Sequence, residues 1–166
     1  MRSVVLLRRY LSLGALLFWQ GGFTFYAAVV IPITRQVLSE HSRLPLAAQI
    51  TGSVTTWLNW AGVVALLPLL WDLAVAVDAS RRRFGLRCAC WAVCFASLST
   101  LFMLHYLLDR YGPLEGLQAP DQPAFWMLHS AYIWTSTLVW LGALIYLGLT
   151  LSAWRAEDGA VGTSKG

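Results

Sequence analysis

Long stretches without charged residues alternate with short polar segments along the 166-residue chain. Charge is absent from residues 11–33, 54–71, 88–108 and 124–154, and the second stretch stays apolar through Asp72 to residue 77. A helix needs about 20 apolar residues to cross a hydrocarbon core about 30 Å thick. The pattern therefore predicts an all-α transmembrane four-helix bundle with spans at about 11–33, 54–77, 87–108 and 125–153.

The same pattern argues against other architectures. Membrane strands show alternating segments of about ten residues, whereas these stretches are apolar on all sides. Four such helices in a soluble protein would have no polar face toward water. The first stretch follows Arg8 and Arg9 as a signal peptide would, but its 23 residues exceed the signal range of about 7–15. We expect one membrane domain over 1–154 and a disordered cytoplasmic tail over 155–166.

Composition supports a lipid environment. The chain is 58% hydrophobic and only 12% charged, against about 45–50% and about 25% in soluble domains. The net charge is +4, but no basic stripe with interleaved aromatics appears, so nucleic acid is not an expected partner. The expected partners are the lipid bilayer and a second copy or another membrane protein.

The arginines predict the orientation. Nine of the twelve basic residues fall in the N-terminal segment, the segment between spans two and three, and the C-terminal segment. Cytoplasmic segments collect Lys and Arg, so both ends are predicted to be cytoplasmic. Helix packing is expected to use small residues. Cys88, Ala92, Ala96 and Thr100 form a stripe at four-residue spacing in span three, and glycines such as Gly21, Gly22, Gly62 and Gly142 are further candidates.

Polar groups within the spans are the candidates for function. The four-span topology brings a set of them to similar depth near the outer face: Tyr26, Thr55, Asn59, His105, Asp109, His129 and Tyr132. His105 and Asp109 share a helix face at i, i+4. The two histidines come from consecutive antiparallel spans.

Several interpretations of this cluster stay open. The histidines can be structural residues bonded to backbone carbonyls, Asp109 or headgroup water. The cluster can relay protons or gate a solute, because histidine titrates near neutral pH. His105 and His129 can be axial ligands of haem b, or both can join Asp109 around a transition metal. Asp72 is expected to reach the Arg81–Arg83 patch or headgroup water, and Gln20 to bond a neighbouring helix.

A resemblance adds a family expectation. Four segments carry it: Phe18–Tyr26 with Ile31-Pro32, Thr55–Trp60, Leu104-His105, and His129–Trp134. They resemble a group of uncharacterised small bacterial four-span integral membrane proteins with no assigned function, which implies a bacterial inner membrane. A looser similarity to four-helix copper-resistance proteins implies no ligand here, because their Met-rich or Cys-rich loops are lacking.

These observations favour a membrane protein without catalytic machinery. No Ser-His-Asp set, phosphate-binding glycine loop or zinc motif is visible. We expect a structural or accessory protein, or an oligomer that handles protons or a solute, and no cofactor. The alternative is a haem- or metal-binding redox protein that uses His105 and His129.

Overall fold

The computed structural model describes residues 2–39, 44–76, 78, 80–111 and 123–163. Within these ranges every element is helical: α1 (Arg2–Phe25), η1 (Tyr26–Val30), α2 (Ile31–Ser39), α3 (Leu44–Val75), α4 (Arg81–Tyr111) and α5 (Pro123–Thr163). Four helices in the described part of the chain are long and apolar enough to cross a membrane, at Ser3–Leu38, Gln49–Val75, Arg81–Arg110 and Pro123–Gly159. The chain is a multi-pass transmembrane four-helix bundle, as predicted.

The first span is continuous from α1 through η1 to α2. In η1 the helix widens, and the N–H of Ile31 donates to the carbonyl of Tyr26, five residues back. Pro32 follows directly and has no N–H to offer to the preceding turn. Such π-helical turns commonly occur at functional sites. Here the turn begins at the buried Tyr26, one of the candidate site residues.

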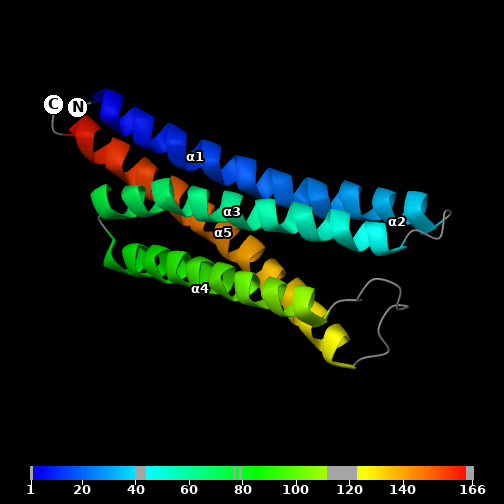
Figure 1. The fold of residues 1–166 in the computed structure, drawn as a ribbon. Coiled ribbons are helices and arrows are strands. Elements are labelled where there is room, and N and C mark those ends of the chain that lie inside the picture. The colour runs from blue at the N-terminus through cyan, green and yellow to red at the C-terminus, as the bar shows by residue number, and fades with distance from the viewer. Residues whose placement is uncertain (1, 40–43, 77, 79, 112–122, 164–166) are drawn as a thin grey trace.

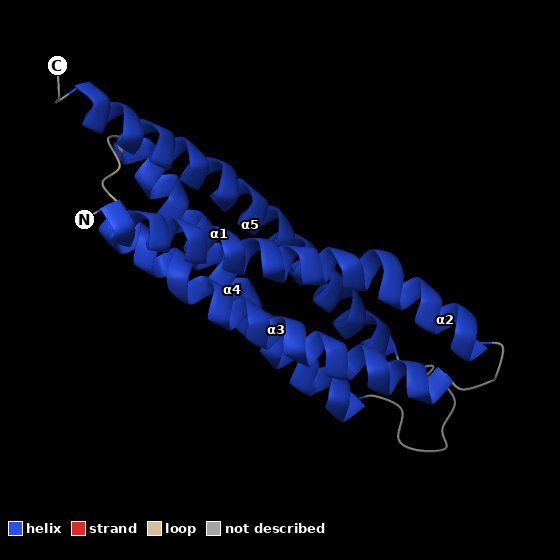
Figure 2. Cartoon of the chain, turned by 90° about the horizontal axis from the view of Figure 1, so that it is seen from above, coloured by secondary structure: helices blue, strands red, loops and turns tan. Residues whose placement is uncertain are grey.

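The helices pack antiparallel to their neighbours, so both described chain ends lie at one end of the bundle (Figure 1). The opposite end carries α2, the start of α3, the end of α4 and the start of α5 (Figures 1 and 2). We call these the termini end and the loop end. A cluster of buried apolar side chains fills the bundle between them, contributed by all four spans: Leu16, Trp19, Leu66, Leu69, Leu98, Leu101, Val139, Ala143 and Tyr146.

Two sequence-based expectations about the ends of the spans need correction. The helices extend beyond the predicted 11–33, 54–77, 87–108 and 125–153 at most ends, because amphipathic turns continue them past the apolar stretch. The tail predicted to be disordered from 155 is helical to Thr163, because Glu157 and Asp158 pair with arginines of α1. Residues 164–166 of that tail lie outside the described residues.

The predicted packing stripe of α4 is also wrong. Ala92, Ala96 and Thr100 are exposed on the surface of the bundle. The buried face instead carries Arg87, Cys94, Leu98 and Leu101. Both sets have helical spacing, so spacing alone does not choose between them.

Three of the four predicted packing glycines do permit close helix contacts. A Cβ at Gly62 would lie 2.6 Å from the Trp19 ring, one at Gly142 would lie 3.1 Å from Cys94 Sγ, and one at Gly22 would lie 3.3 Å from Leu58. A Cβ at Gly21 would meet nothing within 4 Å. The close contacts lie between α1 and α3 and between α4 and α5, the pairs that small residues allow to approach in lipid.

At the termini end, a carboxylate joins the four spans. Asp72 of α3 is fully buried and lies 2.9 Å from Arg8 Nε of α1 and 2.5 Å from Arg87 Nη2 of α4. The indole N–H of Trp154 in α5 donates at 3.0 Å to Asp72 Oδ1, the same oxygen that Arg8 approaches, whereas Arg87 lies at Oδ2. Asp72 was expected to reach the Arg81–Arg83 patch or headgroup water. It pairs with Arg87 instead, because that residue lies about one turn beyond Arg83 along α4 and faces the bundle interior.

Further contacts extend this network. Arg87 Nε donates to Thr150 of α5 at 3.2 Å, and its guanidinium lies 5.6 Å from the centre of the Tyr146 ring. Tyr146 donates to the carbonyl of Leu69 at 2.9 Å. Toward the surface, Arg8 and Arg9 both bond Glu157, and Arg9 also bonds Asp158. The termini end is therefore closed by ion pairs and hydrogen bonds.

The segment between α3 and α4 has an ion pair of its own. Asp78 accepts hydrogen bonds from the Arg83 guanidinium at 2.6 and 3.0 Å and from the backbone N–H of Ser80 at 2.9 Å. The hydrogen bond from Arg83 lowers the pKa of Asp78 below its ordinary value of 3.8. This ion pair ties the segment before α4 to the first turn of that helix.

Gly62→Ala should destabilise the bundle. The new methyl group collides with the Trp19 ring, which is buried and cannot swing away. Overpacking of this kind costs about 1–3 kcal/mol. Gly21→Ala is the matched control: it meets no neighbour and gains helix propensity. Unfolding in mixed micelles should show a loss for the first variant and none for the second. Equal effects would contradict the packing described.

Asp72→Asn should lower stability by about 3–5 kcal/mol, because the buried Arg87 then has no carboxylate closer than Asp78 at 3.9 Å, and Arg8 is left with Glu157 alone. The double variant Asp72→Asn, Arg87→Met should recover part of this loss, since it removes the buried charge that has lost its close partner. Asp158→Asn, at an exposed ion pair, should change stability far less. The free energy of unfolding of the four proteins checks this. An Asp72→Asn variant that is as stable as the unchanged protein would show that the network is dispensable.

The Asp78–Arg83 ion pair should make stability depend on pH in the acid range. A carboxyl whose pKa is lowered by folding stabilises the fold fully above its unfolded pKa, near 3.8, and the contribution disappears as pH falls through the lower folded pKa. Asp78→Asn should therefore lower the melting temperature at pH 7. The difference in melting temperature between the variant and the unchanged protein should shrink as pH falls below about 4. A gap independent of pH would contradict the ion pair.

Candidate functional site

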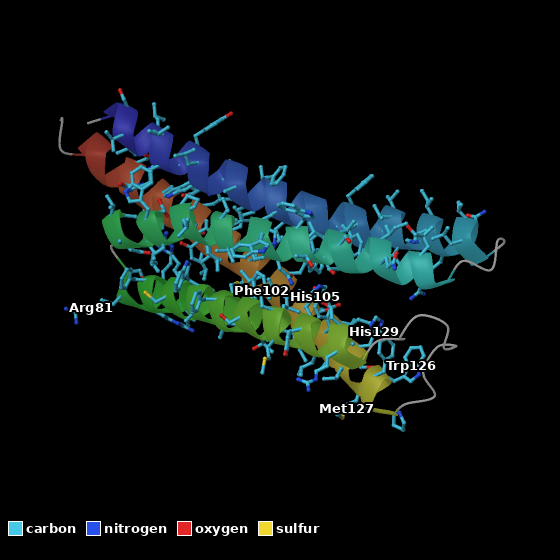
Figure 3. All side chains as sticks on the ribbon, in the orientation of Figure 1. Arg81, Phe102, His105, Trp126, Met127 and His129 are labelled. Atoms are coloured by element: carbon cyan, nitrogen blue, oxygen red, sulfur yellow. The ribbon has the colours of Figure 1, made fainter. Side chains whose placement is uncertain are left out.

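At the loop end, polar side chains of α3, α4 and α5 lie close together. The His105 ring of α4 points toward α3, where its Nε2 lies 2.8 Å from Thr56 Oγ1 (Figure 3). The same nitrogen lies 3.5 Å from Asp109 Oδ2, one turn further along α4. His105 is 19% exposed and Asp109 is 69% exposed. These three groups form a chain from the surface to the interface of α3 and α4.

The hydroxyl of Thr56 is well placed to serve either histidine tautomer. It already donates to the carbonyl of Gly52 at 3.0 Å, so its oxygen can accept a hydrogen bond from Nε2–H of His105. If Nε2 is unprotonated, the hydroxyl can turn and donate to it instead. The site therefore keeps a hydrogen bond to the ring while the ring's protonation changes.

A second group of polar residues lies deeper. Asn59 of α3 is buried and donates to the Tyr132 hydroxyl of α5 at 3.3 Å. The Tyr132 ring lies 6.4 Å from the His105 ring, and Tyr132 also interacts with Thr55. Tyr26 joins from the first span by donating to the carbonyl of Thr51 at 3.4 Å. The structure thus brings together six of the seven predicted cluster residues, counted over the described part of the chain.

His129 has different surroundings. Its ring stacks on Phe125 with the centres 6.0 Å apart and meets the edge of Trp126 at 6.2 Å (Figure 3). Both partners are on its own helix. No group of three or more His, Cys, Asp or Glu residues that could hold a metal ion occurs among the residues that the structure describes. The geometry of the described residues therefore adds no support to the metal-site hypothesis, and the haem alternative stays a prediction.

A hollow of about 490 Å³ opens beside the Thr56–His105 pair. It is lined by Ser53, Thr56, Trp57 and Trp60 of α3. We call it the loop-end hollow. The sequence did not lead us to predict a hollow at Trp57 and Trp60. The signal that was available is their spacing with Ser53 and Thr56, which places all four on one face of α3.

Two polar groups lie in the middle of the bundle without a bonding partner. They are Oε1 of Gln20 in α1 and Oγ of Ser136 in α5, and both are buried. Gln20 was expected to bond a neighbouring helix, and its Oε1 has no such partner among the described residues. An unpaired polar atom within a membrane protein costs free energy.

Comparison of the chain with models of known protein families, with curated proteins and with solved structures finds no match.

Proposed function

We propose that this chain is a bacterial inner-membrane protein with both ends in the cytoplasm, and that it exchanges protons or binds a solute at its outer face through His105. The observation that carries the proposal is the chain of Asp109, His105 and Thr56, with distances of 3.5 and 2.8 Å. Histidine is the side chain whose ordinary pKa lies closest to physiological pH. The resemblance to small bacterial four-span proteins supports the location, and nine basic residues in three segments support the orientation.

The contrast between the two ends favours a site that opens to one side. The loop end offers an exposed carboxylate and a hollow. The termini end is occupied by Asp72 and Arg87, which are fully buried. Between them lies a core of leucine, tryptophan and tyrosine side chains. These features support exchange with the outer water and argue against passage through a single chain.

The test is whether the His105 ring responds to pH on one side only. The protein is labelled with ¹⁵N in its histidine rings and placed in vesicles of one orientation, with the pH varied outside or inside. The His105 signal, identified by its loss in His105→Gln, should respond to the pH on the loop-end side alone. His129→Gln is the control and should leave that response unchanged.

Two outcomes would overturn the proposal. The His105 signal could follow the pH on the termini side, which would mean that the site opens the other way. It could also stay constant over the whole range, which would leave the residue a structural one. A reporter fused after Lys165 and active only outside the cell would contradict the orientation separately.

A further inference from the structure

At the termini end, one carboxylate lies between two buried arginines. Asp72 of α3 lies 2.9 Å from Arg8 Nε of α1 and 2.5 Å from Arg87 Nη2 of α4. The side chains of Asp72 and Arg87 are fully buried, and that of Arg8 is 2% exposed. A buried charge that loses its partner strongly destabilises a fold. Asp72 therefore serves as a close counter-charge for both arginines at once.

Each of these arginines also faces a second carboxylate with a different nitrogen atom. Arg8 Nη2 lies 2.8 Å from Glu157 Oε2 of α5. Arg87 Nη1 lies 3.9 Å from Asp78 Oδ2, in the segment between α3 and α4. This nitrogen is buried and has no hydrogen-bond partner among the residues that the structure describes. The side chains thus alternate in charge in a five-residue network, which runs in the order Glu157, Arg8, Asp72, Arg87 and Asp78.

The two outer carboxylates of the five-residue network are shared with arginines nearer to water. Glu157 also pairs with Arg9, which is 17% exposed, and Asp78 also pairs with Arg83, which is 21% exposed. Arg9 has a further partner in the exposed Asp158. Water can solvate these surface arginines when a carboxylate moves away, whereas the two buried arginines depend on the carboxylates that remain. The buried pair therefore decides how strongly the termini end is held closed.

The five-residue network contains three carboxylates and two arginines, so it tolerates the loss of one outer carboxylate. If Glu157 leaves with the end of α5, Arg8 keeps Asp72. If Asp78 leaves with its segment, Arg87 keeps Asp72. If both leave, one carboxylate remains for two buried arginines, and one buried charge is uncompensated. The second loss therefore destabilises the closed arrangement far more than the first, in whichever order the two occur.

We propose that the five-residue network is a latch, which lets the termini end open only when the end of α5 and the segment between α3 and α4 both withdraw their carboxylates. Asp72 makes the latch conditional, because it lies between the two arginines and can hold whichever one has lost its outer partner. Either segment can move alone while the other keeps the bundle closed. The latch does not depend on the proposed function, since His105 lies at the opposite end of the bundle.

The test is a double-variant cycle on the full-length protein in mixed micelles, with Glu157→Gln and Asp78→Asn. The two residues are joined through Arg8, Asp72 and Arg87. Each single variant should raise the unfolding equilibrium constant modestly. Independent sites would give a double variant equal to the product of the two single effects. The latch predicts a further rise of about tenfold above that product, within the range of measured couplings.

The matched control is the cycle of Asp158→Asn with Asp78→Asn. Asp158 follows Glu157 on α5 and pairs with Arg9, as Glu157 does. Glu157 additionally pairs with the buried Arg8. The control cycle should therefore give the simple product of its single effects.

A third substitution keeps the test decisive if the double variant does not fold. Adding either Arg8→Met or Arg87→Met to the double variant leaves Asp72 with one buried arginine. Both triple variants should therefore recover most of the excess loss. Recovery by either substitution is the specific sign of exchange, because it requires Asp72 to serve the arginine that remains.

Opening of the latch is measured by hydrogen exchange of the Trp154 indole N–H, which bonds Asp72. Exchange should stay slow in both single variants and become about tenfold faster in the double variant. Four results would each overturn the inference. They are a double variant equal to the product of its single effects, the same excess in the Asp158 control, no recovery in the triple variants, and exchange that is fast in a single variant or unchanged in the double variant.

Discussion

Asp72 is the point at which the four spans of this bundle meet. Its carboxylate pairs with arginines from α1 and α4 and accepts a hydrogen bond from a tryptophan of α5. In a bilayer, apolar side chains are surrounded by apolar groups whether or not the helices associate, so burying them yields little free energy. Contacts of the Asp72 type therefore contribute an unusually large share of the free energy of helix association. A charge placed at this depth is tolerated only when it is compensated. The two arginines and the carboxylate therefore depend on one another, and each fixes the depth and rotation of its helix.

The rotation of α4 shows how far sequence reasoning reaches. The existence, number and approximate positions of the spans followed from uncharged stretches, and the described residues confirm them. The buried face of α4 did not follow, because Ala92 and Ala96 offered as regular a stripe as Cys94 and Leu101. Arg87 decides between the faces by turning inward to Asp72. The Arg87–Asp72 pair is a tertiary contact that the sequence does not reveal. The rule that arginine lies at the membrane surface would instead place Arg87 outside the bundle interior.

The candidate site was predicted in the same partial way. Depth alone placed Thr55, Asn59, His105 and Asp109 near one another, because antiparallel spans of similar length bring equivalent positions together. The pairing of His105 with Thr56, and of Asn59 with Tyr132, depends on side-chain directions that depth does not supply. The hollow lined by tryptophans was missed for a related reason. A tryptophan near the membrane surface is usually interpreted as an anchor. That it lines a hollow is evident only when the neighbouring residues on the same helix face are considered with it.

The pairing of α5 with α1 has a consequence for how the bundle assembles. Arg8 belongs to the first span, and Asp72 of α3 and Arg87 of α4 join it when the next two spans are in place. Two arginines then share one buried carboxylate until α5 brings Glu157, 149 residues further along the chain, to Arg8. In a bundle without α5 the network of Arg8, Asp72 and Arg87 would therefore carry one excess positive charge, which makes the fourth helix part of the charge balance of the other three.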